Sequence, residues 1–252
     1  MGHKTLINGT AYGIKGGRAL IGGTGYGIKS GKTLIGGTGY SISFGKPLSG
    51  FTTGSIVKLN ESGVPAEFYV AQHNYYRAYN GAGKTLLVRK DCLADRVWLA
   101  DLRDVEEDNW NNYYGDSDIS TWLAGTYAYS LDASIRSAAN SRVQCIKNGD
   151  RTVTIGAKVF LLSMTELGES SSSYDFTEGE ILPIASLLKT AKRNGSSCTQ
   201  WTRSPSSRST EAVFYMTSSG SATWDDCTTS KGVRPVLALP DSTLVSDSGL
   251  IT

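Results

Sequence analysis

The residues that most often carry out catalysis are few in this chain. It has two histidines, His3 and His73, and neither accompanies a Gly-x-Ser-x-Gly elbow or a histidine-based metal pattern. The sequence does not exclude a pair of carboxylates that cleaves glycosidic bonds, because such residues meet only in the folded protein. We therefore expect a protein that is not an enzyme.

The four cysteines, Cys92, Cys145, Cys198 and Cys227, are far apart, and none belongs to a Cys-x-x-Cys pair. This spacing argues against a zinc site and against a dense disulfide framework. Free buried thiols are the simplest interpretation. A Cys198–Cys227 bridge stays open, because two strands could bring these residues together.

Two stretches end like a phosphate-binding loop, Gly31-Lys32-Thr33 and Gly83-Lys84-Thr85. The loop also needs a glycine five positions before its closing glycine, where this chain has Tyr26 and Ala78. Neither stretch follows a long apolar strand with a helix behind it. We therefore exclude nucleotide binding.

The composition limits the classes of protein to which this chain can belong. The chain has 252 residues, 39% hydrophobic and 19% charged, enough for one sizeable β-rich domain with an appendage. Its net charge of +2 comes without a run of Lys and Arg, so we expect no nucleic-acid partner. No apolar stretch approaches the roughly 20 residues of a membrane span. No secretory signal follows Lys4, so we expect synthesis in the cytoplasm.

The first 50 residues repeat with a period of 14, with Leu, Gly, Tyr and Ile in register. Pairs such as Asn8-Gly9 favour tight turns, so each unit predicts two very short strands and two turns. One unit cannot bury its apolar side chains alone. We expect residues 1–50 to form an assembly or docking arm rather than a flexible linker. The apolar residues expected to make its contacts are Leu6, Tyr12, Ile14, Leu20, Tyr26, Ile28, Leu34, Tyr40 and Ile42.

Residues 51–240 are expected to form one globular domain, followed by a tail over 241–252. Alternating apolar residues predict a hairpin over 54–75 that turns at Glu61-Ser62-Gly63. A buried strand is predicted over 84–93, and strands return over 152–167.

Two short helices are predicted between those strands. Ser117 or Asp118 can cap the first, and Gly125 is expected to stop it. Asp132 or Ser134 can cap the second. The order of strands and helices predicts an α+β fold.

The end of the domain resembles a known family. The elements Trp201-Thr202-Arg203-Ser204-Pro205 and Gly232-Val233-Arg234-Pro235 are similar to the closing elements of a domain family common in bacterial genomes and their prophages. The stretches GSIVKLN, TLLVRKDCL, YGDSDISTWLAG and AKVFLLSMTELG follow that family's order, and the repeats resemble arms on its prophage members. The resemblance implies a C-type-lectin-like fold, related to formylglycine-generating-enzyme-like domains and to phage receptor-binding proteins. It also implies that the protein is a component of a phage particle.

The matched motif is expected to be structural. Its indoles can anchor a small core, and its arginines can donate forked hydrogen bonds to loop carbonyls or to an acid such as Asp118. The adjacent prolines stiffen the chain. The residues concerned are Trp122, Trp201, Arg203, Pro205, Arg234 and Pro235.

The stretch 206–231, here called the recognition face, combines hydroxyls, aromatic rings and scattered charges. This composition is typical of adaptable binding surfaces. A solvated hairpin without a partner stays open as the alternative. The residues expected to face a partner are Arg208, Glu211, Tyr215, Thr217, Ser219, Trp224, Asp225 and Asp226.

Calcium-dependent sugar binding has no support in the sequence, although it stays open. True C-type lectins resemble one another in a Glu-Pro-Asn or Gln-Pro-Asp loop followed by Trp-Asn-Asp. This chain has Trp224-Asp225-Asp226 and Trp110-Asn111-Asn112, but no such proline triplet. A solvated loop is the simpler interpretation of the acidic cluster Asp101, Asp104, Glu106, Glu107 and Asp108. We expect no cofactor and no metal.

These observations predict a virion protein that binds the host surface, as a tail-fibre, tail-tip or baseplate adhesin. A capsid or tail decoration protein is the alternative, and an enzyme acting on cell-wall glycan is a weaker one. The expected partners are other virion proteins, further copies of the chain, with a trimer as a guess, and a glycan or protein of the host surface.

Overall fold

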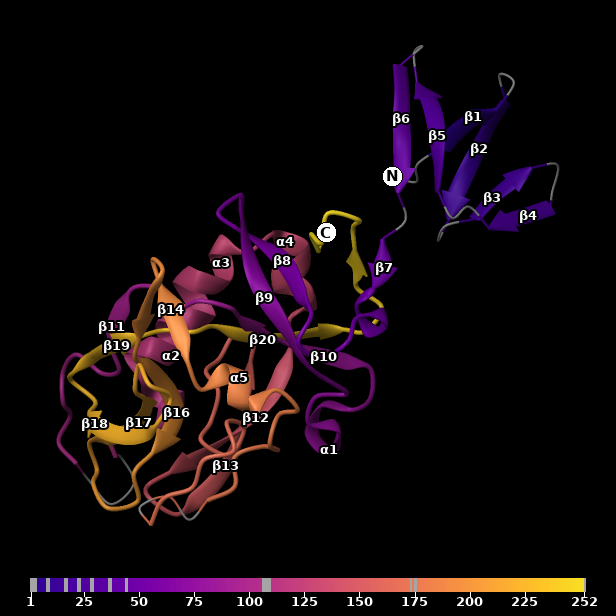
Figure 1. Cartoon of the computed structure of the whole chain (residues 1–252). Helices are drawn as coiled ribbons and strands as arrows, with labels where there is room; N and C mark the ends of the chain where they lie inside the picture. The colour runs from indigo at the N-terminus through magenta and orange to yellow at the C-terminus, as the bar shows by residue number, and fades with distance from the viewer. Residues whose placement is uncertain are drawn as a thin grey trace.

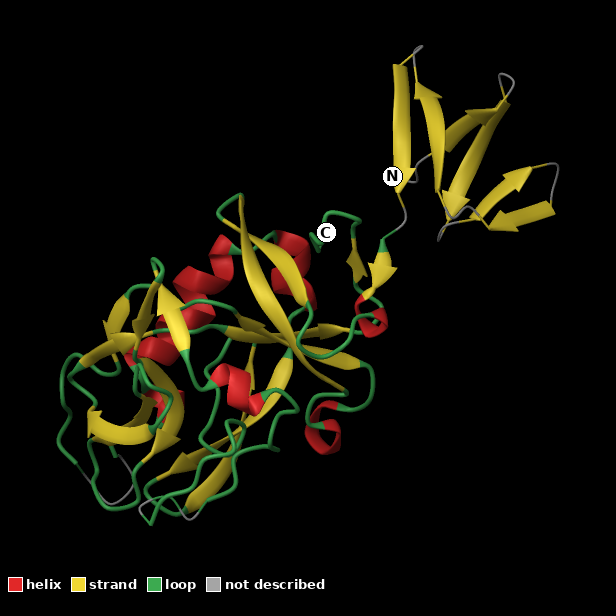
Figure 2. Cartoon of the chain, in the orientation of Figure 1, coloured by secondary structure: helices red, strands yellow, loops and turns green. Residues whose placement is uncertain are grey.

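The computed structural model describes residues 4–7, 10–15, 18–21, 24–27, 30–35, 38–43, 45–105, 110–172, 174 and 176–251. Over these residues the chain is a mixed α+β protein with many strands and a few short helices (Figures 1 and 2), as the order of the sequence patterns predicts. None of the described helices has the length and apolar composition that crossing a bilayer requires.

The first six strands follow the 14-residue period. Leu6 pairs with Ala11 in the first unit and Leu20 with Gly25 in the second, and the third unit repeats this register. Among the described strands these six pair only with one another, in the orders β1-β2-β3-β4 and β5-β6. Ile28 and the side chains of the other apolar arm residues lie outside what the structure describes. The strands are β1 (Lys4–Ile7), β2 (Thr10–Lys15), β3 (Arg18–Ile21), β4 (Thr24–Gly27), β5 (Ser30–Ile35) and β6 (Thr38–Ser43).

One four-stranded sheet of the body has the order β20-β10-β9-β8 and is antiparallel throughout. Its first hairpin turns at Ser62 and Gly63, both at positive φ, the conformation of a two-residue turn that matches the twist of the strands. The predicted hairpin and the predicted strand are therefore both present, the strand ending at Arg89. The strands are β8 (Ile56–Glu61), β9 (Val64–His73), β10 (Lys84–Arg89) and β20 (Val236–Pro240).

A second sheet of five strands has the order β11-β19-β16-β17-β18. Its β16 and β19 are parallel, and the other neighbours are antiparallel. In Figure 1 the orange to yellow strands β16, β17 and β18 lie together at one end of the body. The strands are β11 (Asp95–Val97), β16 (Gln200–Pro205), β17 (Ala212–Met216), β18 (Ala222–Asp226) and β19 (Ser230–Gly232).

Three further strand pairs are separate from these sheets. The pair of β7 and β21 joins residues before the body to the predicted tail, and Leu48, Val245 and Ile251 are buried. The structure therefore packs residues 45–50 and 241–251 onto the body. The pairs are β12 (Ser141–Lys147) with β13 (Arg151–Ala157), β14 (Ala191–Arg193) with β15 (Ser196–Cys198), and β7 (Lys46–Pro47) with β21 (Leu244–Val245).

The helical segment after Ser117 is longer than its sequence predicts. The Ser117 hydroxyl accepts the N–H of Ser120 at 3.1 Å, so it caps the helix. Gly125 does not end the helical segment: a π-helical turn over Leu123–Tyr127 connects α2 (Asp118–Trp122) to α3 (Ala128–Ser130). Leu123 and Tyr127 are buried, and their packing outweighs the weak helix propensity of glycine.

The second predicted helix is α4, with Ile135 buried beneath it. Asp132 precedes its first residue, but the Asp132 carboxylate accepts the Asn60 amide at 2.9 Å instead of capping the helix. The described helices are α1 (Arg77–Asn80), α2 (Asp118–Trp122), α3 (Ala128–Ser130), α4 (Ala133–Ala138) and α5 (Ala185–Leu188), with 3-10 turns at Leu48–Gly50 and Tyr114–Asp116.

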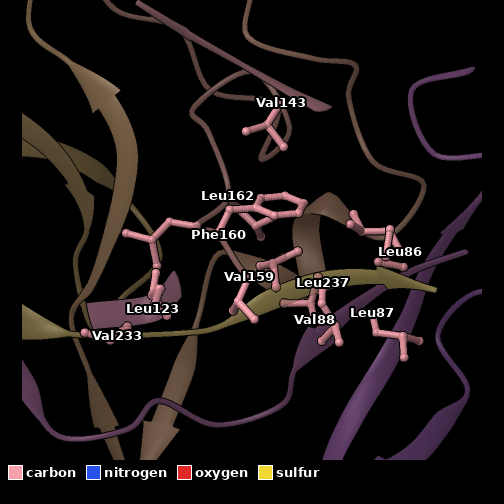
Figure 3. Packing of buried hydrophobic residues seen from close by; sticks show 14 of the residues in the cluster. Leu86, Leu87, Val88, Leu123, Val143, Val159, Phe160, Leu162, Val233 and Leu237 are labelled. Carbon is pink, nitrogen blue, oxygen red and sulfur yellow. The ribbon is translucent and has the colours of Figure 1, made fainter. Parts of the chain in front are cut away.

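The strand predicted over 152–167 ends at Ala157, because the next residues enter the core. Phe160 and Val236 exchange two backbone hydrogen bonds of 2.9 Å, and the Leu162 carbonyl accepts the N–H of Arg203 at 2.8 Å. Figure 3 shows Phe160 and Leu162 among side chains of the four-stranded sheet, of β12 and of the helical segment. This segment is therefore held between the two sheets.

Candidate recognition face

The edge of the five-stranded sheet carries part of the predicted recognition face. Of the described strands, β18 pairs with β17 alone. Phe214 and Trp224 lie opposite each other, as do Tyr215 and Thr223. Phe214 is buried against Tyr174, whereas Trp224 is 57% exposed. The edge strand therefore presents a large indole to solvent, directly across from a ring that is fixed in the core.

A second group on this sheet is bound together by one lysine. The Lys231 ammonium lies 4.7 Å from the centre of the Tyr215 ring and 5.6 Å from that of Trp201. It also pairs with the Asp225 carboxylate at 2.6 Å. Partial burial raises the pKa of Asp225, but Lys231 and the N–H of Asp226 outweigh that effect, so this pKa lies below its usual value. Asp225 thus already has a cationic partner within the chain.

The small polar residues shape the ends of the hairpin. Thr217 and Ser219 lie 2.9 Å apart through their hydroxyl oxygens, and the N–H of Ser221 donates to the Thr217 oxygen at 3.0 Å. At the other end, Asp226 accepts the N–H and the hydroxyl of Thr228 at 2.8 and 2.7 Å. These predicted contact residues therefore hold the two turns that present β18.

The loop before β17 is clamped from inside by Asn112. Its amide nitrogen donates to the carbonyls of Ser206, Ser209 and Ala212, at 3.2, 2.6 and 3.1 Å. Arg208 is exposed at the loop tip, and its guanidinium donates to the Ser172 carbonyl at 2.9 Å. Glu211, half-buried, lies where the loop enters β17.

A buried ion pair lies behind the recognition face, on β16, the strand that pairs with β17. Arg203 and Glu166 are both 0% exposed and form two parallel hydrogen bonds, of 2.6 and 3.0 Å. The guanidinium also donates to the carbonyls of Gln144, Leu161 and Glu178, at 2.9, 2.6 and 3.1 Å. This network, the Arg203 hub, satisfies the cation in full, which a buried charge requires.

A second carboxylate of the Arg203 hub belongs to Glu178. It accepts the N–H of Ile146 at 3.2 Å and the Tyr174 hydroxyl at 3.0 Å, and the Ser204 hydroxyl as well. Burial raises the pKa of Glu178 to about 7, although Arg203 and the hydroxyls oppose the shift. The Glu178 carboxyl therefore keeps its proton up to about neutral pH.

Among the residues that the structure describes, the other buried arginine of the matched motif has no carboxylate hydrogen-bonded to it. Arg234 donates to the carbonyls of Arg89, Lys90 and Leu188 at 2.7, 2.9 and 2.8 Å, and more weakly to Thr190 and Gln200. Burial lowers the pKa of Arg234, and the nearby ionisable groups offset only part of this. We call these contacts the Arg234 hub.

The remaining motif residues contact other segments of the body. Trp201 is 2% exposed and donates its ring N–H to the Arg96 carbonyl at 2.9 Å. Trp122 is half-buried, with the Arg96 guanidinium 3.9 Å from its ring centre. Pro205 ends β16, and the Pro235 carbonyl accepts the N–H of Arg89 at 2.9 Å.

Two residues that the sequence offers for chemistry, Asp118 and His73, are bonded within the chain. Asp118, named as a possible acid for the arginines, accepts the N–H of Ala100 at 2.8 Å instead. The ring nitrogens of His73 each lie 2.7 Å from an oxygen, the hydroxyl of Thr85 and the carbonyl of Phe51. His73 thus links β9 to β10 and to the entry of the chain into the body.

The residues described contain no group of three or more His, Cys, Asp or Glu side chains that could hold a metal ion. Asn111 is bound to the backbone of Arg103 in both directions, at 3.0 and 3.1 Å. Glu106, Glu107 and Asp108 of the predicted acidic cluster lie outside the described residues, while Asp101 and Asp104 are exposed.

Three supporting residues, Glu166, Glu178 and Asn112, are missed by the sequence reasoning. They are far in the chain from the residues that they hold, and the sequence points to Asn112 only as part of a lectin-like triplet. The available signal was physical: a motif with two arginines expected to be structural calls for acceptors elsewhere in the domain.

The part of the chain that contains both hubs matches a known protein family. A family model described as Domain of unknown function (DUF6273) matches residues 82–241. The searches of curated proteins and of solved structures gave no match.

Proposed function

This chain belongs to the DUF6273 family, and we propose that it is a non-catalytic recognition protein of a phage particle. Its body is a C-type-lectin-like domain that binds a glycan or protein of the host surface, and its repeat arm attaches that domain to the particle. The observation that carries the proposal is the exposed Trp224 on an edge strand of a sheet with a fixed interior.

The lectin-like assignment is supported by the architecture together with the sequence resemblance. Short strands form several small sheets, short helices lie between them in sequence, and long irregular segments connect them. Loops supported by such a scaffold commonly carry binding residues.

The edge hairpin suits recognition for two physical reasons. An exposed edge strand offers unpaired backbone groups and alternating side chains to a partner. A rigid indole supplies a large contact area at low conformational cost. Arg208 and Glu211 lie on the neighbouring loop and provide charges of both signs. In this proposal Trp224, Arg208 and Glu211 contact the partner. The residues that are bonded within the chain hold the shape of the surface.

The repeat arm suits attachment because its units share one register. The hairpins of all three units share one register, with six paired positions in the third and four in each of the others. Such units gain stability from their neighbours, so copies from other chains or from another virion protein would complete them. A deletion should end before Lys46, because β7 pairs with β21 of the body. The shortened chain is expected to fold and to be missing from assembled particles.

The test compares particles carrying Trp224→Ala with particles carrying Tyr129→Ala. Tyr129 is the matched control because it is an aromatic residue on α3 and is 72% exposed. We expect both variants to be incorporated at wild-type copy number, and the Trp224 variant alone to lose adsorption to host cells.

Two results would contradict the adhesin proposal. Particles that lack the protein and still adsorb normally would remove the adhesin function. Failure of the Trp224 variant to enter particles, with the control incorporated, would support the decoration protein instead.

A further inference from the structure

Cys92 and Cys198 lie next to each other, although 105 residues of sequence separate them. Cys92 follows β10, and its N–H donates to the Lys192 carbonyl of β14 at 2.8 Å. Its sulfur lies 4.0 Å from the Thr199 carbonyl oxygen, in the residue directly after Cys198. Cys198 ends β15, opposite Ala191 of β14. The two thiols therefore meet where the β14–β15 hairpin crosses the end of β10, close enough to influence each other electrostatically.

The other cysteines have different surroundings. All four thiols are free in this structure. Cys145 is fully buried beside Arg203, and Cys227 interacts with Asp226 and Glu211. The bridge left open by the sequence joined Cys198 to Cys227, but the structure brings Cys198 to Cys92.

The thiol pair is open to small reagents from the surface. Cys92 lines a hollow of about 430 Å³ together with Arg89, Leu93, Ala94, Arg193 and Asn194. A second hollow, of about 230 Å³, lies between the segment after β10 and the same hairpin, with Lys90 and Asp91 on one wall and Lys192 and Ser197 on the other. Cys198 is partly exposed, whereas Cys92 is 4% exposed.

We propose that Cys92 and Cys198 are a dithiol site that forms a reversible disulfide by exchange with a small disulfide such as oxidised glutathione. The Cys198 thiolate attacks one sulfur of the reagent, breaks its S–S bond and releases the first small thiolate. The Cys92 thiolate then attacks the Cys198 sulfur of the mixed disulfide and releases the second. The two thiol protons pass to the two released thiolates, and the two electrons lost by the cysteines reduce the reagent to two thiols.

The order of the two attacks follows from exposure and charge. Burial raises the pKa of the Cys92 thiol, and the neighbouring Cys198 adds to this effect, while Arg234 opposes it. The partly exposed Cys198 is therefore the attacking thiol, and Cys92 the resolving one.

The bond would fasten the β14–β15 hairpin to the end of β10. Both hollows have walls from these two segments, so the bond fixes the distance between their walls. It also closes a long loop of the chain, which restricts the unfolded state. A reducing cytosol would keep the site as a dithiol, and an oxidising exterior would close it. The inference does not depend on the proposed function.

The test uses the full chain, first reduced and then incubated with oxidised glutathione. Free thiols are alkylated, and peptides from a non-reducing digest are identified by mass spectrometry. We expect a peptide pair linked through Cys92 and Cys198, alkylation of Cys145 and Cys227 only after unfolding, and a higher thermal midpoint that dithiothreitol reverses. Four alkylated thiols after unfolding, glutathione left on Cys198, or a link between any other two cysteines would overturn the proposal.

Variants of three cysteines serve as controls. Cys145→Ser and Cys227→Ser should keep the linked peptide and the thermal shift, and Cys198→Ser should lose both. If Cys198→Ser fails to fold, the peptide map of the wild-type chain still decides, because it needs no variant.

Discussion

The interior around β16 and the edge hairpin of β17 and β18 use similar residue types in opposite ways. In the interior, the charges of Arg203 and Glu166 are fully buried and bound to each other. At the edge, Arg208 and Trp224 face solvent. This difference teaches that neighbouring segments can serve two purposes: the charges of β16 fix the body, whereas Arg208 and Trp224 are exposed. Variants in the two regions should therefore separate stability from binding.

The two buried arginines differ in a similar way. Arg203 has a carboxylate partner, whereas the hydrogen bonds of Arg234 go to carbonyls and to the Gln200 side chain. Removing Arg203 leaves a buried anion without its counter-charge. Removing Arg234 leaves only neutral acceptors without their donor.

The largest effect is expected for Arg203→Met. Breaking a buried pair from one side costs about 3–5 kcal/mol, because the remaining charge is stranded. Urea unfolding should show this loss, and the double variant with Glu166→Met should recover part of it. Equal losses in the single and double variants would mean that the stranded Glu166 charge is not the cause.

A smaller and pH-dependent effect is expected at Glu178. Its pKa in the folded protein is about 7, above the ordinary value of 4.5. Between these two values the unfolded chain releases the proton while the folded chain retains it. The free energy of unfolding contributed by Glu178 therefore falls as the pH rises through this window, by about 3 kcal/mol in total.

Glu178→Gln checks the pH effect directly, because it keeps the shape and removes the titration. Unfolding measured from pH 4.5 to pH 8 should have a shallower dependence on pH in this variant than in the wild-type chain. Parallel curves would show that Glu178 does not titrate in this range.

Arg234→Met is expected to cost less than Arg203→Met. The change removes several hydrogen bonds to buried carbonyls, with a loss of about 1–3 kcal/mol, but it also removes a desolvated charge. Chemical denaturation of the two variants side by side measures the difference. A greater loss for Arg234 would contradict the distinction between the two hubs.

The sequence predicts the strand-rich α+β class and the first hairpin of the body because these depend on local patterns. Ser62 and Gly63 suit a tight turn, and Ser117 suits a helix cap. The structure differs where packing decides. Gly125 stays helical between Leu123 and Tyr127, and the expected strand after Ala157 becomes the central segment of the core.

The sequence predicts the candidate site only in part. The stretch 206–231 was selected by composition, which gives residue types but not their direction. The structure separates the exposed Trp224 from Asp225, Thr217 and Ser219, whose partners lie within the chain. Glu166 and Asn112 could not be found from sequence, because their contacts join segments that meet only in the fold.

The measurement that tests the central claim most directly is adsorption by particles carrying Trp224→Ala, with particles carrying Tyr129→Ala as the control. Because Trp224 is exposed, its removal should change the free energy of unfolding by less than about 0.5 kcal/mol. The account predicts unchanged unfolding and incorporation, with adsorption lost in the Trp224 variant and retained in the control. Wild-type adsorption by the Trp224 variant would contradict it.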